Sequence, residues 1–332
     1  MGSAKLRLPP VGRRVGVKRV AVIDCGTNSI RLLIGDLTPH GLVDIERQMR
    51  VVRLGHGVDA TGRLDPQALA RTIAATRDYA ELAARHGASA RRFVATSATR
   101  DADNRDLFVQ AVTDVWGTAP EVISGQEEAE LSYRGATAGL ADGGQTTVVD
   151  IGGGSTELVR GRGRVEAARS LDVGCVRLTE RHLAASLDAA GRPSAAALAA
   201  ARADVRALLA PAVADLALAR TQTLIGLAGT ITTVTAHALG LPAYDPGAIH
   251  GARLPVAQAL AACAKLIEAT RADKEAMGFM HPGRVDVIAA GCVVWSEVIT
   301  AVAEAVAATG QELTHVRTSE HDILDGIALS LA

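Results

Sequence analysis

Two short loops in the sequence carry residue types that suit the binding of phosphate. The first is the segment DCGTNS at 24–29, which lies between two apolar, β-rich runs. Gly26 allows the backbone to turn tightly or to approach a ligand closely. The next three residues add side-chain donors to the backbone N–H groups: Thr27, Asn28 and Ser29. Such a loop can hold phosphate oxygens, with Asp24 placed to hold a cation. An ordinary Asn/Gly hairpin turn is the alternative interpretation.

The second loop, DIGGGSTE at 150–157, is the more specific of the two. Three consecutive glycines weaken a simple hairpin, but they suit a phosphate chain that lies against bare backbone. The loop also contains Asp150 and Glu157. Carboxylates are the usual protein ligands that place Mg²⁺ beside phosphates. The segment therefore predicts a site for both phosphate and metal.

A third glycine-rich segment, LIGLAGTITT at 224–233, predicts a strand that leads into a helix. Gly229 and Thr230 then lie at the N-terminus of that helix, where backbone N–H groups bind anions. The segment is not a P-loop, because no Gly-Lys-Ser/Thr follows, and it lacks the dinucleotide pattern G-x-G-x-x-G.

The loops and the residues that follow them indicate that a domain has been duplicated within the chain. Residues 24–35 and 150–161 are identical at five of twelve aligned positions, with a constant offset of 126 residues. A repeat of this length is typical of duplicated domains rather than of a solenoid, whose repeats run over about 20–50 residues. We expect each loop to join the first two strands of one half, and the boundary between the halves to lie at 138–145.

The apolar patterns predict alternating strands and helices in both halves. Expected strands are 17–24, 30–37, 45–53, 92–96 and 121–123, then 146–150, 156–161, 169–171 and 223–230. Expected helices are 66–86, 105–116 and 126–138, then 194–218, 231–239, 254–270, 285–308 and 321–330. We therefore expect an α/β protein with a basic arm at 1–17, an N-terminal domain at 18–138 and a C-terminal domain at 139–332.

Composition narrows the classes of function. The chain has 332 residues, a net charge of −1, 48% hydrophobic residues and only 2% aromatic residues. This composition excludes wholesale disorder, and it argues against base-stacking or globally basic nucleic-acid binders. The four cysteines form no C-x-x-C pair, which favours a reduced, cytoplasmic protein. No apolar run approaches the ~20 residues of a membrane helix, so we do not expect a membrane as a partner. Because of the charge and the low aromatic content, we do not expect nucleic acid as a partner either.

In combination the motifs resemble the actin/Hsp70/sugar-kinase superfamily, and within it the Ppx/GppA family of exopolyphosphatases and guanosine pentaphosphate phosphatases. The resemblance rests on 22–31, 95–100, 123–129 and 149–157, with weaker matches at 170–174, 229–230 and 285–291. It extends from about residue 18 to the end, with Arg284-Val-Asp286 departing from the family pattern R-A-D. It implies two ribonuclease-H-like domains with a phosphate cleft between them, and a final helix that packs back on the N-terminal domain.

The resemblance also implies two catalytic residues. Glu128, the second glutamate of SGQEEA at 124–129, matches the glutamate that orients or deprotonates the attacking water. Partial desolvation near the cleft would raise its proton affinity, which suits a general base. Stabilisation of the helix dipole is the alternative interpretation for Glu127 and Glu128. Arg100 matches the arginine that clamps the terminal phosphate.

The same resemblance assigns the remaining site residues. The first phosphate site comprises Gly26, Thr27, Asn28, Ser29, Arg31 and Ser97. The second comprises Gly152, Gly153, Gly154 and Ser155, and a nucleotide-side loop of the superfamily is matched by Gly229 and Thr230. The implied ligands of Mg²⁺, partly through water, are Asp24, Asp150 and Glu157, with Mn²⁺ as the alternative metal.

The implied function is the Mg²⁺-dependent release of terminal orthophosphate from inorganic polyphosphate by a cytoplasmic homodimer. Long family members carry a further C-terminal helical region, so we expect this chain to prefer short polyphosphate. One alternative is removal of the 5′-phosphate of guanosine pentaphosphate (pppGpp). A second is a sensor that binds pppGpp or ppGpp with little catalysis, and a third is a sugar kinase. The Glu-Glu helix disfavours a kinase, which needs an aspartate base in an acceptor loop.

Two further features have simpler interpretations. The dipeptide His321-Asp322 matches the His-Asp pair of the HD phosphohydrolase motif, but the sequence has no further His and Asp ligands at suitable spacing. We expect it to be the N-terminus of the final helix. Cys25 is expected to be a small buried residue rather than a nucleophile.

Overall fold

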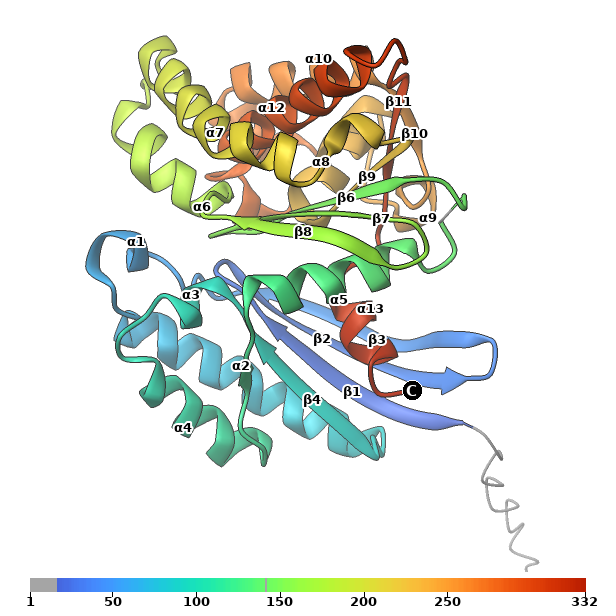
Figure 1. Cartoon of the computed structure of the whole chain (residues 1–332). Helices are drawn as coiled ribbons and strands as arrows, with labels where there is room; N and C mark the ends of the chain where they lie inside the picture. The colour runs from blue at the N-terminus through green and yellow to red at the C-terminus, as the bar shows by residue number, and fades with distance from the viewer. Residues whose placement is uncertain (1–16, 141) are drawn as a thin grey trace, which may run out of the picture.

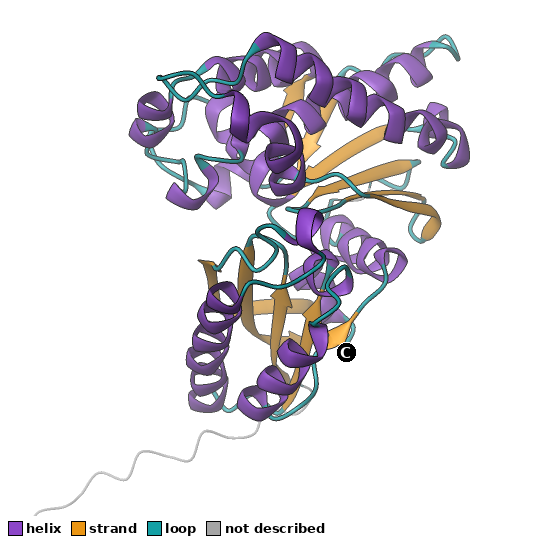
Figure 2. Cartoon of the chain, turned by 90° about the vertical axis from the view of Figure 1, so that its left-hand side faces the viewer, coloured by secondary structure: helices purple, strands orange, loops and turns teal. Residues whose placement is uncertain are grey.

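The computed structural model describes residues 17–140 and 142–332, so the expected basic arm at 1–17 lies, except for Val17, outside the described residues. Two mixed β-sheets, each with its own helices, lie one above the other (Figure 1). Figure 2 shows the same two units from the side, each with its layers of strands and helices. The architecture is α/β, as expected.

The first sheet has the strand order β3-β2-β1-β4-β5. Its first three strands are antiparallel neighbours, whereas β4 and β5 run parallel to β1. The bounds are β1 (Lys18–Cys25), β2 (Ser29–Thr38), β3 (Gly41–Val51), β4 (Ala90–Ala95) and β5 (Glu121–Val122). Ala21 and Ile23 are buried on one face of β1, and Val20 and Val22 on the other. A strand covered on both faces needs this continuous apolar run.

Two helices cover one face of the first sheet: α2 (Pro66–Arg85) and α4 (Arg105–Trp116). α2 begins where the sequence predicts, because the side chain of Asp65 accepts hydrogen bonds from the first free N–H groups of the helix, at 2.9 and 3.0 Å. Beneath these helices, Phe93 packs edge-on against Phe108 and Trp116. The mostly aliphatic core of the first unit therefore contains a small aromatic cluster, although the chain as a whole is poor in aromatic residues.

The second sheet repeats the first with one strand added. Its order is β10-β11-β9-β6-β7-β8, so β8-β7-β6-β9-β11 corresponds to β3-β2-β1-β4-β5, with the same parallel and antiparallel neighbours. The bounds are β6 (Thr146–Ile151), β7 (Thr156–Gly161), β8 (Val165–Leu171), β9 (Thr223–Leu227), β10 (Arg253–Pro255) and β11 (His315–Thr318). The expected pair of ribonuclease-H-like domains is confirmed by this repeated topology.

Four helices form the main apolar layer of the second unit: α7 (Ala195–Asp215), α8 (Ala228–Ala238), α10 (Val256–Glu268) and α12 (Ile288–Ala307). α12 lies at the centre of this layer and contacts α7, α8 and α10. By length and apolar composition α12 alone, among the described residues, would qualify as a membrane span, yet 72% of that stretch is buried inside the fold. It is a core helix of the second unit.

Two helices are exchanged between the units. α5 (Gly125–Thr137) follows the first sheet in the chain but packs on the second sheet, against β6, β7 and β8. α13 (Ile323–Leu329) follows the second sheet but packs on β1 and β2 (Figure 1). The two helices touch so closely that a Cβ at Gly135 would lie 1.8 Å from the carbonyl oxygen of Asp322. The exchange ties the two units together.

Several short elements differ from the expected pattern because they are too short to show a periodicity. They are α1 (Val58–Thr61), α3 (Ser97–Arg100), α6 (Cys175–Leu178), α9 (Pro246–Ile249), α11 (Arg271–Ala276), the π-helical turn η1 (Thr179–Leu183), and the 3₁₀ turns η2 (Ala184–Ser186), η3 (Leu218–Arg220) and η4 (Pro282–Arg284). The strands β10 and β11 were also not expected. In addition, α8 begins at Ala228, so the expected strand at 223–230 is three residues too long.

Candidate functional site

The first glycine loop is a tight hairpin turn fixed to its neighbours. The N–H of Gly26 donates to the carbonyl of Ser29 at 2.9 Å, and the hydroxyls of Thr27 and Ser97 share a hydrogen bond of 2.8 Å. The carbonyl of Asn28 accepts from two N–H groups that follow β3. The loop is thus braced by β3 and by the start of α3, and both phosphate-binding and turn interpretations fit its backbone.

The second loop repeats this turn and lies against the first. The N–H of Gly152 donates to the carbonyl of Ser155 at 3.0 Å, which matches the bond at Gly26. A Cβ at Gly153 would lie 2.8 Å from Cβ of Thr27, and a Cβ at Gly154 would lie 2.6 Å from the hydroxyl of Ser97. The glycine run therefore has a structural reason that the sequence did not reveal, since it lets the loops of the two units approach each other.

A cavity of about 120 Å³ lies between the two loops. Most predicted site residues line it: Asp24, Gly26, Thr27, Asn28, Ser29, Arg31, Ser97, Glu128, Asp150, Gly152, Gly153, Ser155, Gly229 and Thr230. Three predicted residues do not line it: Arg100, Gly154 and Glu157. Arg100 contacts Glu128, and Glu157 faces Asp150 across the strand pair, so both lie next to residues that line the cavity. Gly154 packs against the first loop.

Glu128 is buried in the first turn of α5, with 8% of its surface exposed. Arg100 donates from one Nη1 both to Oε2 of Glu128, at 3.2 Å, and to the carbonyl of Ile123, at 2.9 Å. Burial raises the pKa of Glu128 well above its usual range, Glu157 raises it further, and Arg100 opposes the rise. A carboxyl that holds a proton readily and borders a cavity is suited to general-base chemistry.

The neighbouring glutamate has a different environment. Glu127 is more exposed and pairs with Arg92 at 2.8 Å, outside the cavity. It lies in the first turn of α5, where its N–H donates to the side chain of Ser124, the N-cap, at 3.2 Å. The helix-dipole interpretation therefore fits Glu127, and burial beside the cavity distinguishes Glu128 from it.

Asp150 and Glu157 face each other across the antiparallel strands β6 and β7. Ser132 donates to Asp150 at 2.6 Å and Ser170 donates to Glu157 at 2.8 Å, but no basic side chain pairs with either carboxylate within the described residues. Burial raises the pKa of Asp150 to about 8, and Glu157 adds to that rise. Burial likewise raises the pKa of Glu157 to about 7.

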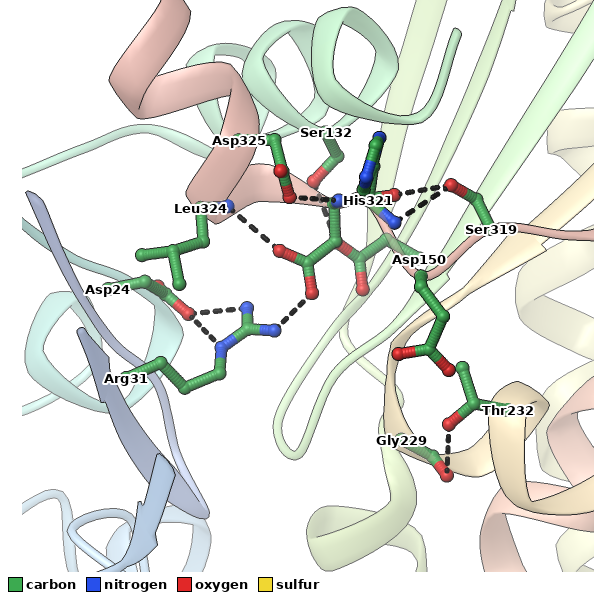
Figure 3. A network of polar contacts seen from close by, with 12 residues as sticks. Asp24, Arg31, Ser132, Asp150, Gly229, Thr232, Ser319, His321, Leu324 and Asp325 are labelled. Carbon is green, nitrogen blue, oxygen red and sulfur yellow. Dashed lines mark hydrogen bonds and ion pairs between the residues drawn. The ribbon is translucent and has the colours of Figure 1, made fainter. Parts of the chain in front are cut away.

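Asp24 has a basic partner instead. Arg31 donates to Oδ2 of Asp24 from Nε at 3.0 Å and from Nη2 at 2.6 Å. Figure 3 shows the guanidinium of Arg31 pointing toward Asp24 on one side and toward the segment that begins the final helix on the other. Burial raises the pKa of Asp24, and Arg31 opposes the rise.

These acids fit a divalent cation only in part. No three His, Cys, Asp or Glu side chains form a ready metal cage in the part of the chain that the structure describes. However, Oε2 of Glu157 is buried without a hydrogen-bond partner among the described residues, and it lies opposite Asp150, whose carboxylate has only the hydroxyl of Ser132 as a hydrogen-bond partner in that part of the chain. Mg²⁺ is commonly bound by one or two carboxylates, with water and substrate phosphate as its other ligands. Asp150 and Glu157 fit that kind of site, whereas the carboxylate of Asp24 is already occupied by Arg31.

Arg284 is a site residue that the sequence noted only as a departure from a family pattern. Its guanidinium lies on Gly229 so closely that a Cβ there would be 2.5 Å from Nε. It donates to the hydroxyl of Thr233 at 3.1 Å and forms no ion pair with any described carboxylate. A cation without an acidic partner that lines a cavity is suited to bind an anion.

A second cavity, of about 470 Å³, adjoins the first. The two cavities share Arg31, Gly229 and Arg284 among their lining residues. The second also has apolar and aromatic walls, from Phe279, Met280 and Tyr244. Nothing in the sequence indicated this cavity, because its walls come from separate segments near residues 47, 244, 280 and 320.

The two simpler interpretations of the sequence agree with the structure. Asp322 is the N-cap of α13 and forms a capping box with Asp325, so the His-Asp pair begins the final helix. Cys25 is buried, and burial raises the pKa of its thiol well above the usual range, which does not suit a nucleophile.

Comparison with known proteins gives a consistent result. The model of the Ppx/GppA phosphatase family matches residues 33–316. Exopolyphosphatase 2 of Mycobacterium tuberculosis is 49% identical over 328 residues, which cover 96% of this chain and all of that protein. Two solved structures share the fold over 95% of this chain. One is an exopolyphosphatase-like protein with TM-score 0.90, 42% identity and 98% of its chain covered. The other is the Ppx/GppA enzyme of Aquifex aeolicus with TM-score 0.76, 28% identity and 99% of its chain covered.

Proposed function

The chain belongs to the Ppx/GppA phosphatase family and is a hydrolase of phosphoric anhydrides, and from this we propose that it is an exopolyphosphatase. It removes terminal orthophosphate from inorganic polyphosphate by hydrolysis. One observation carries the proposal: the two repeated loops face each other across a cavity that also contains the buried carboxyl of Glu128. Glycines and hydroxyl-bearing residues of both loops line this cavity, and these are residue types that can donate hydrogen bonds to phosphate oxygens.

Glu128 is the general base in this proposal. Its carboxylate accepts a proton from a water molecule, and the water oxygen attacks the terminal phosphorus. The bond from that phosphorus to the bridging oxygen breaks, and the shortened chain leaves with the electron pair of that bond. Arg100 orients Glu128 through its 3.2 Å contact and adds positive charge near the attacked phosphate. The loop N–H groups hold the substrate so that attack and departure are aligned.

Asp150 and Glu157 would hold Mg²⁺, with Mn²⁺ as the alternative. The support is the unpaired, buried Oε2 of Glu157 and the absence of a described basic partner for either carboxylate. When bound, the metal supplies positive charge that offsets the charge of the phosphates. It would also oppose the repulsion that raises the pKa of Asp150 and of Glu128. Asp24 contributes mainly by placing Arg31.

The size of the cavity supports a preference for short chains. A volume of about 120 Å³ holds few phosphates, and the adjoining space of about 470 Å³ is partly apolar rather than uniformly basic. Long polyphosphate needs a continuous basic path, which these walls do not offer. The homodimer and the cytoplasmic location stay predictions.

Release of phosphate from defined substrates tests the proposal. We expect the wild-type protein with Mg²⁺ to release phosphate from short polyphosphate faster than from polymers of several hundred phosphates. Glu128→Gln keeps the size of the side chain but removes the base, so turnover should fall by about 10²–10⁴-fold while binding persists. Glu127→Gln is the matched control and should stay near wild type. Equal turnover by Glu128→Gln and wild type would overturn the assignment of the base.

The second cavity favours one other candidate function, the removal of the 5′-phosphate of pppGpp. Tyr244 and Phe279 offer apolar and aromatic surface to a nucleoside, and Arg284 lies where its phosphates would begin. Release of phosphate from pppGpp, but not from short polyphosphate, would favour this function. Tight binding of pppGpp or ppGpp without turnover of any substrate would favour a sensor.

A further inference from the structure

The final segment of the chain inserts a carboxylate beside the phosphate cavity. Between β11 of the second sheet and α13, which packs on the first sheet, the chain crosses from one unit to the other. Asp322 lies at this crossing with 5% of its surface exposed, and its Oδ2 accepts a hydrogen bond from Nη1 of Arg31. The two residues are 291 positions apart in the sequence. In Figure 3 a dashed line joins the guanidinium of Arg31 to the segment that begins α13.

Arg31 is therefore shared between two carboxylates. Its Nε and Nη2 donate to Asp24, and its Nη1 donates to Asp322. The three side chains together carry a net charge of −1, so the guanidinium offers little positive potential to an incoming phosphate. A guanidinium binds phosphate best through two parallel N–H···O bonds from adjacent nitrogens. Asp24 occupies one such edge, and Asp322 occupies part of the edge that remains.

Asp322 cannot easily move away from Arg31. Its Oδ1 accepts from the N–H of Leu324 at 2.9 Å, and its own N–H donates to Asp325 at 2.9 Å. The backbone is fixed as well, because Gly135 of α5 packs directly on the carbonyl of Asp322. A phosphate that binds Arg31 must therefore share the guanidinium with Asp322 or displace it.

We propose that Asp322 is a specificity-determining residue that occupies Arg31 in place of a phosphate and so limits the affinity of the cleft for short phosphate anions. The proposal rests on the proposed function, in which Arg31 contributes to the phosphate site. Weak binding of short products is useful to a hydrolase, because orthophosphate must leave before the next cycle. A longer chain compensates through its contacts with both glycine loops, whereas orthophosphate and pyrophosphate cannot.

Direct binding of anions by two matched variants tests the proposal. The probes are inorganic pyrophosphate and tripolyphosphate, and their dissociation constants are measured by calorimetry in a Glu128→Gln background with Mg²⁺. Asp322→Asn removes the negative charge but keeps the helix cap, since asparagine caps as well as aspartate. Asp325→Asn is the control, because Asp325 is a buried acid of the same helix that pairs with Arg47 at 2.6 Å and not with Arg31.

We expect Asp322→Asn to bind both probes about 10-fold more tightly, because a like charge is removed from beside the bound phosphate. Asp325→Asn should bind them within about 2-fold of the parent. Tighter binding distinguishes the proposal from a purely structural role, which would weaken binding or leave it unchanged. Asp322→Ser, which also keeps a capping oxygen, replaces Asp322→Asn if that variant does not fold.

The outcomes separate the inference from the proposed function. If the parent binds tripolyphosphate and Asp322→Asn binds it no more tightly, the role of Asp322 is wrong and the proposed function stands. If neither protein binds either probe, both are wrong. Stronger inhibition by orthophosphate in an otherwise wild-type Asp322→Asn enzyme would support the proposal independently.

Discussion

The two halves of the molecule place different charges at equivalent positions of the same hairpin. Asp24 faces Arg31 across β1 and β2, whereas Asp150 faces Glu157 across β6 and β7. Asp150 follows Asp24 by 126 residues, and Glu157 follows Arg31 by the same 126 residues, which is the offset of the repeat. Thus one hairpin carries an ion pair and the other carries two acids. The duplicated backbone gives both loops a similar geometry, and the charge at the equivalent positions of Arg31 and Glu157 differs in sign.

This difference in charge indicates that the two hairpins have different roles in the site. The first hairpin is nearly neutral and can tolerate burial without any ligand, since Arg31 compensates Asp24. The second hairpin is destabilised by its own charge until a cation or protons compensate it, as the raised pKa values of Asp150 and Glu157 indicate. Compensation of this charge is what the proposed metal would supply at the second hairpin. Changes in the metal requirement, in stability and in pH dependence test this comparison in turn.

Removing one acid of the second hairpin should have the largest effect on the metal requirement. Glu157→Gln should raise the Mg²⁺ concentration needed for half-maximal phosphate release by about 10–100-fold, the range for loss of a supporting metal contact. Titration of activity with Mg²⁺ measures this requirement. Asp24→Asn is the comparison, and its requirement should change by less than about 3-fold because Asp24 is occupied by Arg31. An equal increase of the Mg²⁺ requirement in both variants would contradict the proposed difference between the hairpins.

Removing the cation of the first hairpin should affect stability more than metal binding. Arg31→Met leaves Asp24 and Asp322 buried without their common partner. Loss of one partner of a buried ion pair costs about 3–5 kcal/mol of unfolding free energy. Glu157→Gln should have the opposite sign and stabilise the metal-free protein, because it removes an unpaired buried charge. Urea denaturation in the presence of a chelator measures both, and destabilisation by both variants would contradict the comparison.

The glycines of the two loops should also differ. A Cβ at Gly153 would lie 2.8 Å from Cβ of Thr27 and 3.2 Å from the N atom of Asn28, whereas a Cβ at Gly26 would meet nothing closer than 3.7 Å. Gly153→Ala should therefore cost about 1–3 kcal/mol through overpacking between the units. Gly26→Ala should cost less than about 1 kcal/mol. Thermal unfolding of both variants measures the two losses of stability. A larger loss for Gly26→Ala than for Gly153→Ala would show that the first loop is the more crowded one and contradict the prediction.

The stability of the metal-free protein should also depend on pH. Burial raises the pKa of Asp150 to about 8 and of Glu157 to about 7, so the folded state holds protons that the unfolded state has released. Stability is then greatest near the ordinary carboxyl pKa and falls as the pH rises from about 5 to about 8. A fall of at least about 1 kcal/mol, equal to one pKa unit, is expected.

Thermal unfolding at several pH values, with a chelator and then with Mg²⁺, measures this effect. Mg²⁺ should stabilise the protein more at about pH 8 than at about pH 6, because it replaces the protons that the acids have lost. The double variant Asp150→Asn, Glu157→Gln should show a flatter dependence, with Glu128 responsible for part of what remains. A metal-free stability that rises over this range would contradict the raised pKa values.

Local sequence was sufficient to predict much of this architecture. The two hairpins, the long helices and the N-cap at Asp65 depend on neighbours within a few residues, and each lies close to where the pattern predicts. The final helix also begins near His321-Asp322, as expected. The four-residue strand β11 was missed because so short a segment shows no alternation, and its position beside β9 depends on sheet pairing alone. The glycine run lies in the predicted turn between two strands, although its close contact with the opposite loop was not predicted.

What the sequence by itself determined is the duplicated pair of loops, because their glycines, hydroxyls and carboxylates are contiguous in the chain. What only the tertiary structure decided is which charges meet at the cavity. Arg284 reaches Gly229 through the packing of the second unit, and Asp322 reaches Arg31 through the crossing of the final segment. Contacts between residues so far apart follow from the topology of the two sheets and the exchange of α5 and α13. No local pattern encodes them, since electrostatic partners depend on distance in space rather than on separation along the chain.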